Sequence, residues 1–326
     1  MKKAYIKGVG FYMPEKILTN KDLEKMVDTS DEWITSRSGI KERHIAAPQE
    51  TTSTLGARAA KLAIENAHLK PKDIDLIITA TISPDMVFPC TAALIADILD
   101  IRHAGVFDLE AACSGFIYGL SLANQYIKTG EYKNVLVVGS ETLSRITDWQ
   151  DRSTCVLFGE GAGAAVVSES HTESEIMATC LGGDGVYRDL LYMPAGGSLY
   201  PATEETVKKR MHYIKMEGNA TFKVAVTKLS EASLNVLKKA NLKKSDVDLL
   251  IPHQANIRII KMVQKNLDLP DDKVLVNIHK YGNTSAATVP IALAEAVQEH
   301  KIKRGDILVF AAFGGGMTWA SAAVKW

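Results

Sequence analysis

The sequence has few cysteines, no paired cysteine motif and no net charge, and each absence excludes a class of protein. Its four cysteines are Cys90, Cys113, Cys155 and Cys180, and no two of them form a Cys-x-x-Cys pair. This spacing argues against a zinc site or a disulfide framework, so we expect reduced thiols. The 38 basic and 38 acidic residues balance, so no net field attracts nucleic acid.

Long apolar runs are also absent, since no run approaches the length that spans a bilayer. The N-terminus is basic, but Lys7 and Gly8 interrupt it before the apolar core of a signal peptide. We therefore expect a cytoplasmic protein that does not bind membranes. The 46% hydrophobic and 23% charged residues are ordinary for a globular protein, and 326 residues suit two domains or one duplicated unit.

Strand-like and helix-like patterns alternate along the chain. Residues 91–99 have a helical pattern, and the strand-like runs are continuously apolar; they are residues 74–81, 106–109, 135–139, 162–167, 249–252 and 307–311. Continuous apolar strands that alternate with helices predict parallel sheets covered by helices on both faces. The predicted fold class is α/β.

The sequence also repeats itself. Residues 67–78 reappear as residues 240–251, with seven identities in one gapless register. Each copy reads as a helix end, a turn and a buried strand. A Lys-x-x-Asp-x-Asp turn between a helix and a strand is common, but seven identities favour duplication over coincidence.

A weaker repeat supports the same division of the chain. Residues 158–161 precede an apolar strand and are echoed by residues 313–316 before the apolar C-terminus. Two related halves explain both matches. We predict an N-terminal half of residues 1–170 and a C-terminal half of residues 171–326, which meet near the Ser-, Glu- and Thr-rich residues 168–175.

Cys113 is the candidate nucleophile. It follows a predicted strand and precedes a long amphipathic helix. Unpaired N–H groups and the positive end of the helix dipole favour a thiolate there, so we expect the Cys113 pKa to fall from about 8.5 toward or below neutrality. The alternative is a buried small hydrophobe, which is what most free cysteines are.

Two further polar residues lie at junctions of the same kind. His253 follows the predicted strand 249–252, and Asn283 lies in a glycine-containing turn before a helix, where Asn283 or Thr284 is the expected N-cap. Ligands of open α/β sheets bind beyond the carboxyl ends of the strands. We therefore interpret Cys113, His253 and Asn283 as one candidate site.

The motifs around these residues resemble the β-ketoacyl-acyl carrier protein synthase III family of the thiolase superfamily. They are residues 112–116, 252–256, 281–285 and 313–319, in the family's order, together with residues 28–33. The resemblance spans the whole chain. It implies the five-layered αβαβα thiolase fold built from two duplicated halves, a homodimer, and no cofactor or metal apart from the CoA thioester substrate.

The resemblance also implies a reaction, the decarboxylative condensation of an acyl-CoA primer with malonyl-acyl carrier protein that initiates type II fatty acid synthesis. In this hypothesis Cys113 attacks the primer thioester and forms an acyl-enzyme. Nε2–H of His253 and the amide of Asn283 then stabilise the enolate that decarboxylation produces. The backbone N–H groups of Cys113 and, by resemblance, of Gly315 hold the tetrahedral oxyanion.

CoA recognition begins at a predicted helix N-terminus. Thr29 and Glu32 form a capping-box signature, and in the helix that follows, Thr29, Trp33 and Arg37 lie near one face. The resemblance places Trp33 and Arg152 on either side of the adenine and Arg37 at the phosphates. It also assigns to the pantetheine tunnel the residues Asn219, Phe222 and Asn256.

The remaining expectations concern the primer and the carrier protein. Phe88 matches a position that reaches across the family's dimer to close the acyl pocket, and its bulk suits a short primer such as acetyl-CoA, although branched primers are also compatible. Residues 182–203 read as a long loop that covers the tunnel. An acidic carrier protein needs a basic docking patch, for which the candidates are Lys223, Arg258, Lys261 and Lys265.

Other functions are compatible with parts of this pattern. A thiolase would carry a second cysteine in a Cys-x-Gly turn, where residues 313–316 read Phe-Gly-Gly-Gly, and a hydroxymethylglutaryl-CoA synthase would use a glutamate that is not evident in the motifs. A condensing enzyme with another primer or acceptor is also open. A papain-like thiol hydrolase shares the order Cys, His, Asn but not the duplicated halves, and a non-catalytic acyl-CoA-binding protein would not need all three side chains.

Overall fold

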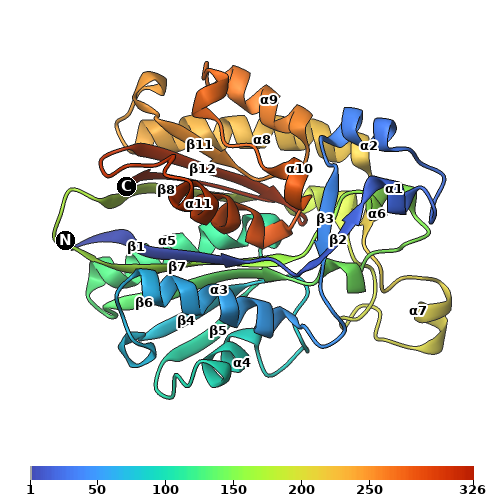
Figure 1. Ribbon diagram of the computed structural model, residues 1–326, viewed down its shortest axis with the longest axis horizontal. Helices are drawn as coiled ribbons and strands as arrows, with labels where there is room; N and C mark the ends of the chain where they lie inside the picture. The colour runs from blue at the N-terminus through green and yellow to red at the C-terminus, as the bar shows by residue number, and fades with distance from the viewer. Residues whose placement is uncertain (1) are drawn as a thin grey trace.

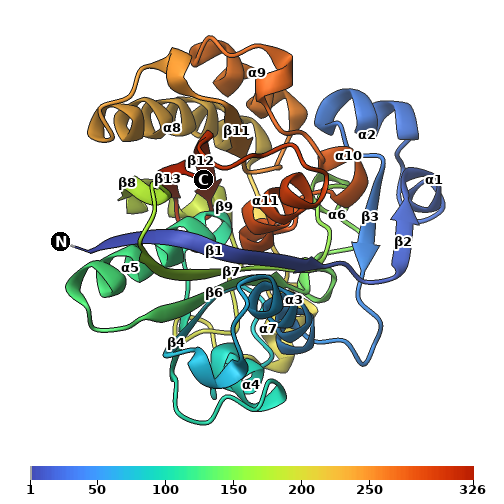
Figure 2. The ribbon, with the colours of Figure 1, turned by 60° about the vertical axis from the view of Figure 1, so that its left-hand side comes forward.

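The computed structural model describes residues 2–326 and arranges two β-sheets and their helices in layers (Figure 1 and Figure 2). The first sheet contains, in spatial order, β1 (Lys3–Tyr12), β7 (Gly161–Ser170), β6 (Asn134–Glu141), β4 (Leu76–Ala80) and β5 (Gly105–Leu109). The second contains β8 (Glu175–Gly183), β13 (Thr318–Lys325), β12 (Ile307–Gly314) and β11 (Leu249–Pro252).

The two sheets follow the same plan. In each, the two parallel strands β6 and β4, or β12 and β11, continue into antiparallel partners, β7 and β1 or β13 and β8. β5 pairs with β4 in parallel, and an isolated parallel bridge from Leu250 to Val274 occupies the matching place beside β11. The predicted α/β class is confirmed, but the prediction of parallel sheets is wrong for four of the seven strand pairs.

Helices form the other three layers. The inner layer between the sheets contains α5 (Gly115–Thr129) and α11 (Thr288–Gln298). The outer face of the first sheet is covered by α3 (Thr52–Asn66) and α4 (Thr91–Ile98), and that of the second by α8 (Gly218–Lys239) and α9 (Ile257–Asn266). This arrangement is the five-layered αβαβα fold that the family resemblance implies.

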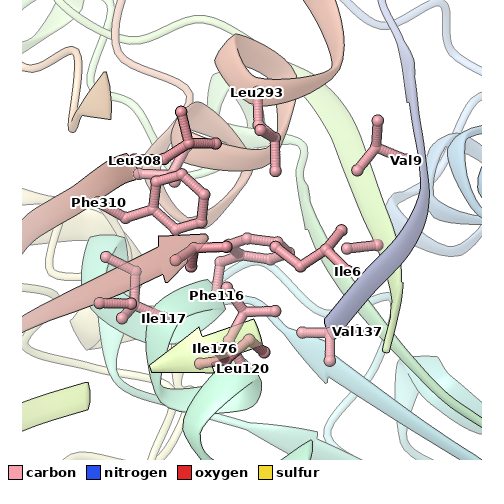
Figure 3. Close-up of a cluster of buried hydrophobic side chains, with 14 of the residues drawn as sticks. Ile6, Val9, Phe116, Ile117, Leu120, Val137, Ile176, Leu293, Leu308 and Phe310 are labelled. Carbon is pink, nitrogen blue, oxygen red and sulfur yellow. The ribbon is translucent and has the colours of Figure 1, made fainter. Parts of the chain in front are cut away.

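Burial on both faces explains why the strands are continuously apolar. In β12, Leu308 and Phe310 join the cluster between the sheets with Phe116 of α5 and Leu293 of α11 (Figure 3). Val309, between them in sequence, packs in the outer cluster under α8 and α9. Because helices cover both faces of the first sheet, the antiparallel strand β7 is buried along nearly its whole length, as the parallel strands β4 and β6 are, so a continuously apolar run does not reveal strand direction.

The sequence repeat corresponds to a repeated structure. His68 and Asn241, which follow α3 and α8, both have left-handed backbone conformations, with φ of 54° and 57°. Asp75 and Asp248 each accept a hydrogen bond of 2.9 Å from the N–H of the first residue of the neighbouring strand, β6 or β12. The repeated aspartates therefore fix the start of a parallel strand pair in each sheet.

Shorter elements gather at the end of the layers away from both termini (Figure 1). They are β2 (Lys16–Thr19), β3 (Glu42–Ile45), α1 (Asn20–Leu23), α2 (Asp31–Ser38), α6 (Arg152–Cys155), β9 (Leu191–Tyr192), α7 (Glu204–Lys208), β10 (Lys215–Met216) and α10 (Ile278–Tyr281). Two 3₁₀ turns precede the inner helices: η2 (Ala112–Ser114) and η7 (Ser285–Ala287). Within residues 2–326, no helix combines the length and the hydropathy that a membrane crossing requires.

Candidate active site

Cys113 lies in the turn η2, between the end of β5 and the start of α5 at Gly115. Its side chain is buried, with 5% of the residue exposed. Ala112, immediately before it, has a φ of 45°, a left-handed conformation that is uncommon outside glycine. The thiol therefore lies near the N-terminus of α5, as the sequence predicts, but in the 3₁₀ turn that precedes the helix.

The expected fall in the Cys113 pKa is wrong for this structure. Burial is the largest effect on the thiol and raises its pKa to about 12, and the carboxylates of Glu141 and Glu110 add to the rise. A buried thiolate loses the hydration of its charge, and here that loss outweighs the effects that lower the pKa, among them the backbone N–H of Cys113 itself. Cys113 is therefore a protonated thiol before substrate arrives.

His253 follows β11 directly, and its backbone N–H donates to the carbonyl of Ala311 at 2.7 Å. The side chain is 2% exposed, and burial lowers its pKa to about 3. The imidazole is therefore neutral at neutral pH, with one N–H donor and one acceptor nitrogen. Within residues 2–326, Nδ1 of His253 has no hydrogen-bond partner.

Asn283 lies in the turn between α10 and η7. Its N–H donates to the carbonyl of Leu157 at 2.9 Å, and its own carbonyl accepts from Gly159 at 3.0 Å. Its side-chain Oδ1 accepts from the N–H of Ser285 at 2.9 Å, which leaves the amide NH₂ as the donor for a ligand. The expectation that Asn283 or Thr284 caps the long helix is wrong, because η7 intervenes and α11 begins only at Thr288.

The three side chains meet at one cavity of about 250 Å³, which Cys113, His253 and Asn283 all line. Cys113 also lines a second cavity of about 590 Å³, together with Gly315. The thiol thus stands where two cavities meet, with His253 and Asn283 on the side of the first. An acyl group attached to Cys113 has room in the second cavity while another substrate occupies the first.

Two guanidinium groups lie near the indole of Trp33, which lines the first cavity together with Arg37, whereas Arg152 lies outside the lining of that cavity. The Trp33 ring centroid is 4.8 Å from the Arg37 guanidinium carbon and 4.9 Å from that of Arg152. The predicted capping box is wrong by one residue, because Ser30, and not Thr29, accepts the Trp33 N–H and caps α2. Thr29 lies outside the helix, and its buried hydroxyl has no partner within residues 2–326.

The candidates for the pantetheine tunnel line the same cavity. Asn219 and Phe222 belong to the first turns of α8, while Asn256 caps α9 by accepting the Arg258 N–H at 2.9 Å. The Arg258 guanidinium carbon lies 5.3 Å from the centroid of the Phe222 ring. Three residues predicted from two separate segments of the chain therefore line one cavity.

Several predicted residues lie outside both cavities. Phe88 is 83% exposed, although its neighbour Val87 lines the second cavity. Lys223, Lys261 and Lys265 are exposed on α8 and α9, and within residues 2–326 they form no ion pair. The structure leaves these four side chains at the surface.

The predicted covering loop and two unpredicted residues complete the site. Leu191, in the predicted loop 182–203, lines both cavities, so this segment forms part of their wall. The sequence analysis missed Ser285, which lines the second cavity, and Glu141, a fully buried carboxylate at the end of β6. Glu141 had one signal, a charged residue two positions after the predicted apolar strand 135–139.

The five layers, the repeated strand order and the Cys-His-Asn cluster define a thiolase-fold condensing enzyme. The chain matches family models described as "3-Oxoacyl-[acyl-carrier-protein (ACP)] synthase III" over residues 107–185 and "3-Oxoacyl-[acyl-carrier-protein (ACP)] synthase III C terminal" over residues 237–326. These matches cover segments that contain Cys113, His253 and Asn283.

Full-length relatives narrow the assignment. A β-ketoacyl-[acyl-carrier-protein] synthase III of Caldanaerobacter subterraneus subsp. tengcongensis is 56% identical over 323 residues, 99% of this chain and 98% of that protein. One of Clostridioides difficile is 53% identical over 99% of this chain and 98% of its own length. The crystal structure of 3-oxoacyl-[acyl-carrier-protein] synthase III from Aquifex aeolicus VF5 has a TM-score of 0.92 at 50% identity, covering 99% and 100% of the two chains. The chain belongs to the β-ketoacyl-acyl carrier protein synthase III family.

Proposed function

We propose that Cys113, His253 and Asn283 carry out the family's reaction in this chain, the condensation of an acyl-CoA with malonyl-acyl carrier protein that initiates type II fatty acid synthesis. The observation that carries this proposal is the position of Cys113 at the meeting point of two cavities. A hydrolase needs room for one acyl group and water. A condensing enzyme needs room for an attached acyl group and a second substrate at the same time, and this site offers both.

In the first step, the Cys113 sulfur attacks the primer thioester and CoA leaves. CoA enters through the first cavity, with its adenine between Trp33 and Arg152 and its phosphates at Arg37. Cation–π and stacking contacts with these side chains suit an adenine ring. The pantetheine arm then passes Asn219, Phe222 and Asn256 to reach the sulfur, and the acyl group passes into the second cavity.

In the second step, decarboxylation of the malonyl group leaves an enolate in the first cavity. Neutral His253 and the free NH₂ of Asn283 supply two hydrogen-bond donors to its oxygen. The low pKa of His253 supports this role, because a neutral imidazole donates without giving up a proton to the enolate. The enolate carbon then attacks the acyl group on Cys113.

The tetrahedral oxyanion of each step needs its own donors. We assign them to the backbone N–H groups of Cys113 and Gly315, which lie on the two segments that border the second cavity. Losing one such donor in other enzymes costs about 3 to 4 kcal/mol of transition-state stabilisation. The chemistry requires no metal, and within residues 2–326 no cluster of three or more His, Cys, Asp or Glu side chains is arranged to hold one.

The carrier protein meets a cationic rim beside the first cavity. Arg258 lines the cavity, and Lys223, Lys261 and Lys265 continue its positive charge along α8 and α9. Lysines without carboxylate partners are free to bind the acidic surface of a carrier protein.

Homodimerisation supplies the missing cover of the acyl pocket. Val87 and Phe88 are 86% and 83% exposed, and β5 is an edge strand of the first sheet, paired with β4 on one side only. Exposed aromatic groups and open strand edges are typical of interfaces. We infer that Phe88 of each protomer closes the partner's pocket and favours acetyl-CoA as primer, and that residues 1–170 supply the nucleophile while residues 171–326 supply His253 and Asn283.

Mass analysis of the carrier protein tests the proposal. Malonyl-acyl carrier protein, acetyl-CoA and this protein should yield acetoacetyl-acyl carrier protein, and Cys113→Ala should yield none. Release of free acetate without condensation would instead identify a thioester hydrolase. If Cys113 were acetylated but malonyl-acyl carrier protein gave no product, the first step of the proposal would stand. Malonyl-acyl carrier protein would then be excluded as the second substrate.

A further inference from the structure

Glu141 has two carboxylate oxygens in unequal surroundings. Oε2 accepts from the hydroxyl of Thr81 at 3.1 Å, the N–H of Ile82 at 3.1 Å and the hydroxyl of Ser83 at 2.5 Å. Oε1 has only longer contacts, with the N–H of Ile82 at 3.3 Å and that of Ala286 at 3.4 Å. Oε2 is therefore fully engaged, while Oε1 has room to accept a proton.

Ser285 lies between this carboxyl group and the nucleophile. It is completely buried, and it lines the second cavity together with Cys113 and Thr81. Its hydroxyl lies close enough to oppose the rise in the pKa of both Cys113 and Glu141. It is nevertheless aligned for a hydrogen bond with neither, and has no partner within residues 2–326.

An unpartnered buried hydroxyl is costly, at about 1 to 3 kcal/mol. Ser285 is also held in a left-handed conformation, with a φ of 48°, by the turn η7. The turn does not need the hydroxyl, because Ala112 adopts the same left-handed conformation in η2 without one. Such a group beside a reactive thiol indicates a role in the reaction.

The reaction leaves one proton without an assigned acceptor. Cys113 starts as a thiol with a pKa of about 12, so its attack on the primer must release a proton. His253, with a pKa of about 3, is a poor base. Burial raises the pKa of Glu141 to about 7, which is the range in which a general base both accepts and returns a proton at neutral pH.

We propose that Ser285 passes the Cys113 proton to Oε1 of Glu141 during primer attachment and returns it after condensation. This proposal rests on the proposed function. In attachment the Cys113 S–H bond breaks and an S–C bond forms; Ser285 takes the thiol proton and gives its own hydroxyl proton to Glu141. The departing CoA thiolate takes a proton from solvent.

Condensation reverses the relay. The S–C bond of the acyl-enzyme breaks, Cys113 leaves as a thiolate, and Glu141 returns the stored proton through Ser285. One solvent proton is consumed per turnover, which balances a reaction that converts a malonyl carboxylate into CO₂ and an acyl-CoA into CoA thiol. Glu141 itself touches no substrate and acts only through Ser285.

The relay predicts a pH dependence for primer attachment. Cys113 is the titratable group that faces Glu141 from η2, and Glu110 acts on Cys113 from the preceding residues. From the other packed segments, Glu141 meets the neutral groups of Thr81, Ser83 and Ser285. The Glu141 carboxyl group must be ionised to accept the proton, so the attachment rate rises as the pH passes upward through about 7.

Single-turnover acetylation of Cys113 by acetyl-CoA, followed by mass analysis over the neutral pH range, tests the relay. Ser285→Ala removes a hydroxyl that has no hydrogen-bond partner and should slow acetylation at least about tenfold. Glu141→Gln keeps an acceptor for Thr81 and Ser83 and should slow it similarly. Both variants should lose the rise with pH.

Two controls separate the relay from a change in structure. Glu160→Gln alters another fully buried carboxylate, held by the N–H groups of Ala46 and Ser144, and should retain the parental rate and pH profile. Primer-independent decarboxylation of malonyl-acyl carrier protein depends on His253 and Asn283. It should stay within about twofold of the parent in Ser285→Ala and Glu141→Gln if only proton transfer is lost.

Each outcome decides the matter. Slow acetylation with a flat pH profile and intact decarboxylation supports the relay. A parental rate and pH profile in Ser285→Ala would overturn it, and equal losses of acetylation and decarboxylation would show that Glu141 and Ser285 only hold the η7 turn. Absence of Cys113 acetylation in the parent protein would be a failure of the proposed function instead.

Discussion

The turns η2 and η7 hold matching places in the two repeats but do different chemistry. Each precedes an inner helix, α5 or α11, and each begins with a left-handed residue, Ala112 at 45° and Ser285 at 48°. Their second residues are Cys113 and Ala286, which are 173 positions apart, the same separation as between the two copies of the sequence repeat. One turn therefore carries the nucleophile, and its counterpart carries a methyl group.

The strand ends that meet these turns differ in a complementary way. Glu141 ends β6, and its carboxylate contacts the Ala286 N–H at 3.4 Å. Gly314, also 173 positions further on, ends β12, and a Cβ atom there would lie 2.5 Å from the Cys113 nitrogen. The last residue of β6 thus brings a side chain to η7, whereas the last residue of β12 brings none to η2. Duplication supplied two equal turns, and the glycine leaves the Cys113 N–H without a side-chain acceptor, available to an oxyanion.

Removing either enolate donor, His253 or Asn283, should cause the largest loss of condensation. It should leave the acetylation of Cys113 in η2 nearly unchanged. We expect His253→Ala and Asn283→Asp each to lower the condensation rate about 10² to 10³-fold, because each removes one donor to the enolate. Asn283→Asp keeps Oδ1 as the acceptor for Ser285, so it leaves the turn in place. Quenched single-turnover assays should show a rate of Cys113 acetylation within a few-fold of the parent. If acetylation fell as much as condensation, His253 and Asn283 would not act on the enolate alone.

The second largest effect should come from adding a side chain at Gly314, the last residue of β12, because this change displaces η2. In Gly314→Ala the new Cβ meets the backbone nitrogen of Cys113, so the turn must shift and the oxyanion donor moves with it. We expect acetylation of Cys113 to slow about 100-fold, the effect of losing one such donor. Gly185→Ala is the matched control, because no atom lies within 4 Å of its added Cβ. Unchanged acetylation in Gly314→Ala would remove the Cys113 N–H from the proposed oxyanion site.

The positions of the three reactive residues could be predicted from the sequence, because their chemistry follows from their place at strand ends. The direction of the Cys113 pKa could not, since it depends on burial by segments far away in the chain. The prediction of strand direction failed for a related reason, because helices on both faces of the first sheet bury its antiparallel strand β7 as fully as its parallel strands β4 and β6. Ser285 and Glu141 carry no spacing signature, and only the fold brings them to Cys113.

Buried groups beside the two turns should respond to pH in opposite directions. His253 has a folded pKa of about 3 against 6.5 in the unfolded chain, so its contribution to stability is present above 6.5 and is lost as the pH falls. Glu141 has a folded pKa of about 7 against 4.5, so its contribution is present below 4.5 and is lost as the pH rises through 7.

Because the contributions of His253 and Glu141 change in opposite directions, they should nearly cancel in the free energy of unfolding of the parent. Removing either group should make that free energy depend on pH. Between pH 7 and pH 5, each group changes the free energy of unfolding by about 2 kcal/mol, with opposite signs. Relative to the parent, His253→Gln should therefore gain stability as the pH falls, and Glu141→Gln should lose it. Urea denaturation at the two pH values measures both; slopes of the same sign would contradict the assigned pKa directions.

The smallest effects should come from the mouth of the first cavity, where the two repeats contribute different recognition groups. Trp33→Ala should raise the KM for acetyl-CoA about five- to tenfold, the size of a cation–π and stacking contact, without changing the KM for the malonyl carrier.

Arg258→Glu should raise the KM for the malonyl carrier by a similar factor, and more at low salt, because the contact is between exposed charges. Lys238→Glu, an exposed charge reversal at the far end of α8, is the control. If Arg258→Glu and Lys238→Glu change the carrier KM equally, net charge and not the cationic rim attracts the carrier protein.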